Sequence, residues 1–301
     1  MKSIAFKGFH KLAVVAIILL LIVSCGNKAN RNKKLVLSSE TAVDSLDKII
    51  KNEILSYKWK ISLDHHRMAK EEEAYTPPAI ATIFSDSRIN ASILENNSQL
   101  IAIDLPFKFL AFAEPDLNRA YLAYTSSDFI IQRHELPDSL FTEYKSKQDE
   151  ILSNFSNATI SEVDLEEVTK GYAIIKNRSD FDFKETVNKL KETINSISGA
   201  KTFGIIDFKN DAELYDIKLN PTTLIFFGAP KPGAKAMKNT PKLGLDAFCQ
   251  KLLIFENKSG EVWVAYNDIE ELSRLYYDTS TIYQKMINRQ LSKTITYCIQ
   301  N

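Results

Sequence analysis

The stretch Pro78-Ala-Ile-Ala-Thr-Ile-Phe84 returns 143 residues later in the chain as Pro221-Thr-Thr-Leu-Ile-Phe-Phe227. Both copies open with proline and continue as the uniformly apolar, β-rich run that is typical of a central strand. Around them, residues 78–124 can be laid over residues 221–266 with one single-residue gap. A spacing that is kept over this length indicates an internal duplication.

Each repeat shows the same order of predicted elements. Apolar residues at helical spacing are followed by two strands, a hairpin and a closing helix. In the second repeat these elements are predicted at residues 182–198, 202–208, 222–227, 251–266 and from Ile269 into the 290s, after a first strand at residues 171–175. In the first repeat they are predicted at residues 46–57, 59–63, 79–84, 107–124 and 140–155, after a strand at residues 34–38. We therefore predict an α+β fold of two tandem repeats, each a mixed β-sheet with flanking helices, packed as a pseudo-dimer.

The length and charge of the chain agree with two domains. We predict a degenerate first repeat at residues 35–155, a polar linker at residues 156–169 and a second repeat with its closing helix at residues 170–301. The full chain has 38 basic and 38 acidic side chains, and removal of residues 1–24 takes away three lysines and leaves a net charge of −3. Because neither sign dominates, the composition does not favour nucleic-acid binding.

Residues 1–25 form a predicted targeting segment rather than part of the fold. Three lysines precede an apolar run at residues 12–23, which is too short to span a hydrocarbon layer of roughly 30 Å as a mature helix. The segment ends in Ile22-Val-Ser-Cys25, which resembles a bacterial lipoprotein signal in which the cysteine is lipidated. We expect acyl chains such as palmitate on Cys25, a tether at residues 26–34 and a lipid-anchored place on the periplasm-facing surface of a cell-envelope membrane. A secretory signal with an incidental cysteine is the alternative.

Two further cysteines follow, Cys249 and Cys298. An oxidising compartment would permit a disulfide between them, whereas the apolar surroundings of Cys249 also suit a buried free thiol. The pair matches neither a Cys-x-x-Cys redox motif nor a zinc knuckle.

Four ordered segments of the second repeat resemble a known family. They are Phe203-Gly-Ile-Ile-Asp207, the proline-rich residues 220–233, Gly244-Leu-Asp246 and the aromatic residues 262–268. This set is similar to the signature of the domain-of-unknown-function 302 family. The resemblance implies an α+β domain with a mixed sheet and helices, here in two copies, and it implies no established activity, cofactor or substrate.

The two repeats divide the elements of that family between them. The second repeat keeps Asp207 but has Phe208 where the family has histidine. The first repeat keeps Asp64 and His65 but has lost the Gly-Asn-Pro turn. If the family uses these elements together, one site could be composed across the interface of the repeats.

Asp64, His65 and His66 form the only sequence cluster of an acid with histidines. They suggest either metal ligation or general base catalysis in which Asp64 orients an imidazole. Adjacent histidines on a strand point to opposite faces, so both would not readily bind one ion. Structural or surface histidines are the alternative.

The turn at residues 228–233 is a second candidate, because it precedes a helix predicted at residues 234–239. Its free N–H groups, with Lys231 or Lys235, could receive an anion. The alternative is a sharp connection between a strand and a helix, since two prolines remove two donors.

Asp104 and Asp246 recur at equivalent places in the two repeats, as do Tyr124 and Tyr266. Each aspartate is expected to be a helix cap or buried hydrogen-bond acceptor, or else a pocket carboxylate. The tyrosines are expected to pack between sheet and helix with the hydroxyl at a rim.

Two hypotheses of function follow. The one we favour is a lipid-anchored, non-catalytic module that binds an unknown small molecule or protein; the other is an enzyme or metal-dependent site built from Asp64, His65 and residues 228–233. The candidate pocket residues are Asp64, His65, Asp104, Asp207, Gly228, Asp246 and Tyr266. We expect one degenerate pocket, no cofactor and no tightly bound metal, since a stable zinc site needs three or four ligands.

Overall fold

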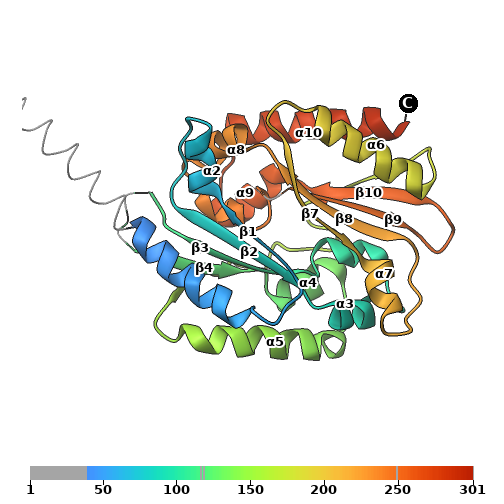
Figure 1. The fold of residues 1–301 in the computed structure, drawn as a ribbon, viewed down its shortest axis with the longest axis horizontal. Coiled ribbons are helices and arrows are strands. Elements are labelled where there is room, and N and C mark those ends of the chain that lie inside the picture. The colour runs from blue at the N-terminus through green and yellow to red at the C-terminus, as the bar shows by residue number, and fades with distance from the viewer. Residues whose placement is uncertain (1–38, 116, 118, 249, 301) are drawn as a thin grey trace, which may run out of the picture.

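The computed structural model describes residues 39–300 apart from 116, 118 and 249, and it contains two five-stranded sheets (Figure 1). The first sheet has the order β1-β2-β3-β4-β5, with β1 (Trp59–Asp64), β2 (Ala79–Ser85), β3 (Phe107–Phe112), β4 (Tyr121–Tyr124) and β5 (Thr159–Ile160). The second has the order β6-β10-β9-β8-β7, with β6 (Ile174–Arg178), β7 (Lys201–Asp207), β8 (Thr222–Gly228), β9 (Gln250–Glu256) and β10 (Val262–Asn267). The predicted signal segment with Cys25, the tether and the strand at residues 34–38 lie outside the described residues.

Helices flank both sheets. In the first repeat a helix covers residues 39–53, followed by α2 (His65–Glu71), α3 (Ser87–Leu94), η1 (Gln99–Ile103), α4 (Ser127–His134), η2 (Asp138–Phe141), α5 (Thr142–Leu152) and η3 (Ser153–Phe155). The second repeat contains α6 (Phe183–Ser196), α7 (Phe208–Glu213), α8 (Pro230–Met237), η4 (Pro241–Gly244), α9 (Ile269–Tyr277) and α10 (Ile282–Gln300). In Figure 1, α6 and α10 lie along one side of the molecule and α5 along the opposite side. The predicted α+β fold of two tandem repeats is confirmed.

The strands of the two repeats pair in the same way. β2 lies between β1 and β3, β8 lies between β7 and β9, and all four pairings are antiparallel. Ala79 pairs with Phe112, and Thr222 pairs with Phe255, so β3 and β9 correspond at the same 143-residue offset as the strands before them. The one-gap alignment of the sequences is therefore wrong in the first strand of the hairpin.

The repeats pack through reciprocal contacts. α2 of the first repeat packs on α8 of the second, and the equivalent α7 of the second packs on α3 of the first. In the same way η1 contacts β8 and β9, while η4 contacts β2 and β3. Each contact has a counterpart with the repeats exchanged, as in the isologous interface of a duplicated dimer. The predicted pseudo-dimer is confirmed.

The main core lies between the repeats, and a second core covers the outer face of the second sheet. Successive side chains of a strand point to opposite faces. On β8, Leu224 and Phe226 face the joint core, whereas Ile225 and Phe227 pack with residues of α6 and α10. Because both faces of this strand are covered, its sequence is continuously apolar from Leu224 to Phe227 instead of alternating.

Several elements differ from their sequence prediction. The closing helix of the second repeat is two helices, because Asp278 has a left-handed backbone (φ 56°) that ends α9. α8 begins at Pro230 rather than residue 234, because proline is well suited to the first turn of a helix. The segment at residues 156–169 contains β5, which pairs in parallel with β4. The helices α2, α3, α4 and α7 were not predicted.

Candidate functional site

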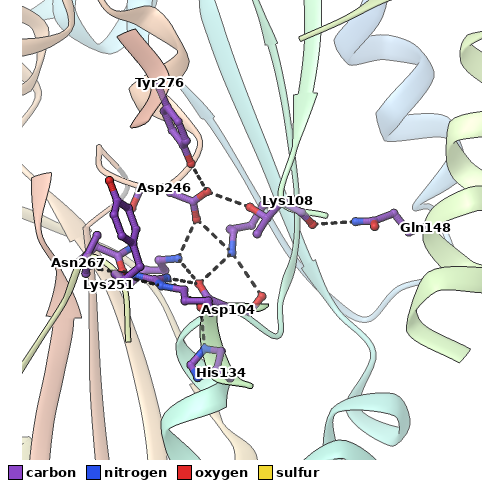
Figure 2. Close-up of polar contacts among 12 residues, drawn as sticks. Asp104, Lys108, His134, Gln148, Asp246, Lys251, Asn267 and Tyr276 are labelled. Carbon is purple, nitrogen blue, oxygen red and sulfur yellow. Dashed lines mark hydrogen bonds and ion pairs between the residues drawn. The ribbon is translucent and has the colours of Figure 1, made fainter. Parts of the chain in front are cut away.

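Asp104 and Asp246 meet between the repeats in a cluster of buried charged side chains (Figure 2). Lys108 of β3 and Lys251 of β9 point into the same space, and Arg133 comes from the end of α4. None of these five side chains is more than 2% exposed. Buried charges of this kind are retained only where they are paired and hydrogen-bonded.

Asp104 is held mainly by two consecutive residues of α4. Arg133 Nη1 donates to its two oxygens at 2.9 and 3.0 Å, and His134 Nε2 donates to one of them at 3.0 Å. The other nitrogens of Arg133 donate to the carbonyls of residues 172–173 and to Oδ1 of Asn267. The guanidinium is therefore fully engaged and connects the carboxylate of the first repeat to the backbone of the second.

Asp246 is held by side chains from both repeats. Its Oδ1 lies 3.0 Å from Lys251 Nζ and 3.2 Å from Lys108 Nζ. Its Oδ2 accepts hydrogen bonds from Thr125 Oγ1 and from Tyr276 Oη, both at 2.9 Å. Both oxygens are thus occupied by protein donors.

The cluster follows the pseudo-twofold symmetry of the chain. His134 and Tyr276 are 142 residues apart, as are Asp104 and Asp246. His134 donates to Asp104 of its own repeat, and Tyr276 donates to Asp246 of its own repeat. The duplication has kept the hydrogen bond at this place while the donor has changed.

The cluster has more positive than negative groups. Apart from His134, two carboxylates face three cations.

The buried charges shift one another's pKa. Burial raises the pKa of Asp104, but Arg133, the hydrogen bond from His134 and both lysines hold it well below its ordinary value. Burial lowers the pKa of Lys108 to about 8, against the opposing effect of Asp246. Lys108 is the cation of the cluster whose proton is easiest to lose.

The cluster fixes the position of the two repeats and leaves no carboxylate oxygen open. Asp104 and Asp246 are buried hydrogen-bond acceptors at the interface. In residues 39–300, outside the three gaps, no three side chains of His, Cys, Asp or Glu are grouped to hold a metal ion.

His65 and His66 open α2 and do not lie on a strand, because Asp64 ends β1 and caps the helix. The expectation that they alternate on a strand is wrong. His65 Nε2 donates to the carbonyl of Gly244 in the second repeat at 3.3 Å, and His66 Nδ1 donates to the carbonyl of Thr76 at 2.6 Å. Burial lowers the pKa of His65 to about 4, so its ring is neutral at pH 7.

Asp64 and Asp207 serve as equivalent helix caps. Asp64 accepts from the backbone N–H of Arg67 at 2.8 Å and from its Nη1 at 2.6 Å. Asp207 accepts from the backbone N–H of Asn210 at 3.1 Å. Within the described residues no hydrogen bond or ion pair joins Asp64 to His65, so the acid–imidazole pair of the enzymatic hypothesis is not formed.

Tyr266 lies apart from the other candidates. It is buried in the core between the second sheet, α6 and α10, away from the charge cluster. Cys298 is a free, buried cysteine in the same core and accepts a hydrogen bond from Thr193 Oγ1 at 3.2 Å. Because Cys298 is free, the disulfide considered for the pair is not formed in this structure; Cys249 itself lies outside the described residues.

His65 and Gly228 line one cavity of about 60 Å³, formed by both repeats. Met68 and Thr76 contribute from the first repeat, and residues 228–230 and 232–234 around the start of α8 contribute from the second. The predicted turn at residues 228–233 is thus the junction of β8 and α8, and it faces the histidine of the other repeat.

The cavity adjoins a groove of about 360 Å³ beside α10. The two spaces share five lining residues, namely Gly228, Ala229, Pro232, Gln250 and Ile287. Further along, the groove is lined mainly by the apolar side chains of Ile197, Ala200, Phe227, Met286 and Leu291. Together they form a mainly apolar site with a few polar groups at its inner end.

Sequence reasoning missed Lys108, Lys251, Arg133, His134 and Tyr276. A signal existed for the lysines, which occupy equivalent positions in two otherwise apolar strands. A lone charge in a buried strand is rarely left without a partner. The other three carry no such signal, because they come from helix ends that only the tertiary fold brings together.

The fold and the site define a duplicated α+β protein whose repeats enclose an ion-pair cluster and share a mainly apolar cavity. The family model described as "Domain of unknown function DUF302" matches residues 32–155 and 175–296. The chain belongs to this family in two tandem copies, as the sequence resemblance predicted.

Curated relatives are similar over a shorter stretch. "Fluoride-specific ion channel FluC 1" of Brucella suis biovar 1 and "Fluoride-specific ion channel FluC 2" of Brucella melitensis biotype 1 are each 33% identical over 84 residues, which is 28% of this chain. The chain spans only 32% and 30% of the length of these relatives. Within the described part of the chain, no helix has both the length and the apolarity needed to cross a membrane.

One solved structure is also similar, the crystal structure of an uncharacterized conserved protein DUF302 from Bacillus stearothermophilus. It is 13% identical, with a TM-score of 0.35, over 42% of this chain and 95% of that chain.

Proposed function

We propose that this chain is a lipid-anchored, non-catalytic binding module of the bacterial cell envelope. Its ligand is a small, mainly apolar molecule, which lies in the cavity beside His65 and the groove that adjoins it. The observation that carries the proposal is the wall shared by these two spaces, which joins a cavity lined by both repeats to an apolar groove of the second repeat. Small-molecule sites are typically concave and apolar, with a few polar groups that orient the ligand.

Polar groups of this kind lie at the inner end of the site. Thr76 Oγ1 is buried and finds no hydrogen-bond partner among the described residues. A buried hydroxyl without a partner costs about 1–3 kcal/mol, which a ligand atom or a water would recover. His65 is neutral at pH 7, and Gln250 adds an amide to the same wall. We propose that these groups orient the polar end of the ligand.

Two observations favour binding over catalysis. The carboxylate of Asp64 is engaged by Arg67 and therefore does not orient His65 for proton transfer. The walls of the groove offer mainly hydrocarbon, which stabilises a ligand by burial rather than by chemistry. The lipid anchor rests on the sequence alone, on the apolar run at residues 12–23 and on Cys25.

The groove can be tested with an apolar fluorescent probe, 1-anilinonaphthalene-8-sulfonate, added to the purified full chain. We expect saturable fluorescence enhancement with one dominant site. Ile287→Asn places an amide in the wall of the cavity and of the groove, and it should weaken binding by about tenfold, or 1.4 kcal/mol. The matched control is Ile282→Asn, because Ile282 lies on the same helix, is 64% exposed and lines neither space.

The proposal requires the two variants to differ. Equal weakening in both, or none in either, with circular dichroism unchanged, would place the probe elsewhere and contradict the proposed site.

A further inference from the structure

A separate cavity of about 220 Å³ lies beside the charge cluster. It is lined by residues of both repeats and by residues 161–163 and Leu165 of the segment that joins them. Thr125, Ser126 and Ser161 line it together with Lys242. None of its lining residues belongs to the cavity or the groove of the proposed function.

Lys242 is a buried cation without an ionic partner in the described part of the chain. Only 4% of the residue is exposed, and its Nζ donates one hydrogen bond of 2.9 Å, to the carbonyl of Glu162. An ammonium group has three donors, so this contact leaves two of them. Burial lowers the pKa of Lys242 to about 8, although Glu114 and Glu162 act in the opposite direction. The burial of this ammonium needs further compensation.

Asp246, the one fully buried carboxylate in the wall, does not supply that compensation. Its oxygens already accept from Lys108, Lys251, Thr125 and Tyr276. The ring of Tyr276 lies 5.3 Å from Lys242 Nζ, and its hydroxyl points to Asp246.

We propose that this cavity binds a small carboxylate, whose oxygens accept hydrogen bonds from Lys242. The hydroxyls of Ser126 and Ser161 complement such a ligand, because a hydroxyl can donate to its oxygens, whereas the hydroxyl proton of Thr125 is already donated to Asp246. A singly charged anion fits better than phosphate, since Asp128 and Glu162 also line the cavity and would repel a second negative charge. The volume suits a ligand of a few non-hydrogen atoms.

The proposal can be tested by titrating the ¹⁵N-labelled full chain with acetate, propionate and glycine, and with inorganic phosphate for comparison. At a ceiling of about 1.5 kcal/mol for each of its four non-hydrogen atoms, acetate binds at best with a Kd on the order of 0.05 mM, and NMR can follow binding of this strength or weaker. We expect saturable shifts of the amide signals of Ser126 and Ser161 with acetate or propionate. A stronger response to glycine would identify the carboxylate source as an amino acid, while a stronger response to phosphate would overturn the proposal.

Lys242→Met should weaken the binding of the carboxylate by at least about tenfold. The matched control is Lys238→Met, because Lys238 is exposed and lies outside the cavity. Equal affinity in Lys242→Met and the wild type would refute the assignment.

A second measurement uses the wild-type protein and does not depend on how the variant folds. Acetylation of Lys242 by acetic anhydride, followed by mass spectrometry, should slow when propionate is present, while acetylation of Lys238 should not change. If propionate does not slow the acetylation of Lys242, the proposal is contradicted, even if Lys242→Met fails to fold. Because the two sites share no lining residue, failure here would leave the apolar groove unaffected.

Discussion

His65 of the first repeat lies directly against Gly244 of the second. Its Nε2 donates to the Gly244 carbonyl at 3.3 Å, and a Cβ atom on Gly244 would lie 2.9 Å from the imidazole ring. Cβ atoms in proteins are essentially never found this close to another heavy atom. A side chain at position 244 would therefore clash with His65, and this close approach requires glycine. The contact joins the cavity of the proposed function to the interface of the repeats.

Gly244→Ala should therefore destabilise the protein, because the new methyl group meets His65 and Met237 at 2.9–3.0 Å. We expect a loss of about 1–3 kcal/mol in the free energy of unfolding, as for other overpacked sites, measured by urea denaturation. Gly233→Ala is the control, since its Cβ would lie 3.5 Å from Phe248, an ordinary contact. Equal losses in the two variants would show that space at Gly244 is not the reason.

The stability of the protein should fall between pH 6.5 and pH 4 because of His65. Its pKa is lowered from 6.5 to about 4 in the folded chain, so the unfolded chain binds the proton first as pH falls. The contribution of the neutral His65 to the free energy of unfolding is complete above pH 6.5. It is lost on acidification, by up to about 3 kcal/mol at pH 4. Urea denaturation at several pH values measures this slope.

His65→Gln removes the titrating group and keeps a donor for the Gly244 carbonyl. We expect its stability to change less with pH over the same window. An equally steep loss of stability in this variant would assign the slope to other groups.

Asp246→Asn should destabilise the protein strongly, because it leaves Lys108 and Lys251 buried with one carboxylate fewer. The loss of one partner of a buried ion pair typically costs about 3–5 kcal/mol, which thermal and urea denaturation would detect. Asp207→Asn is the matched control at an exposed helix cap, where asparagine caps as well as aspartate. A similar effect of both substitutions would mean that the cluster contributes little to stability.

Cys25→Ala should release the protein from membranes or stall its processing, because lipidation requires the cysteine thiol. Fractionation of cells and N-terminal sequencing of the purified protein would measure both effects. Unchanged membrane association together with normal processing would contradict the lipoprotein prediction, and Cys298→Ala serves as the control for loss of a cysteine.

Local sequence patterns predicted the elements that local forces determine. Apolar runs predicted β2 and β8, and helical spacing after Asp182 predicted α6, whose cap the structure places at that residue. Boundaries were missed where a single backbone angle decides them, as at Asp278. The histidine pair was assigned to a strand because its aspartate was not recognised as a helix cap.

The seven candidate pocket residues were found by repetition and family resemblance, and the fold divides them. Asp104 and Asp246 enter the charge cluster, His65 and Gly228 line the cavity, Asp64 and Asp207 cap helices, and Tyr266 lies in the outer core. Residue type and spacing did not separate these roles, because an aspartate that follows a strand can cap the next helix or remain buried.

The sequence by itself determined the duplication, the α+β class and the family, because apolar periodicity and repeated motifs are properties of the chain alone. Only the tertiary structure decided that Lys108 and Lys251 share Asp246, and that His65 faces Gly244. Lys108 and Asp246 are far apart in the chain and belong to different repeats, as do His65 and Gly244. Their contact depends on how two sheets pack across a pseudo-twofold axis, and that geometry is set by the whole interface rather than by any local stretch of residues.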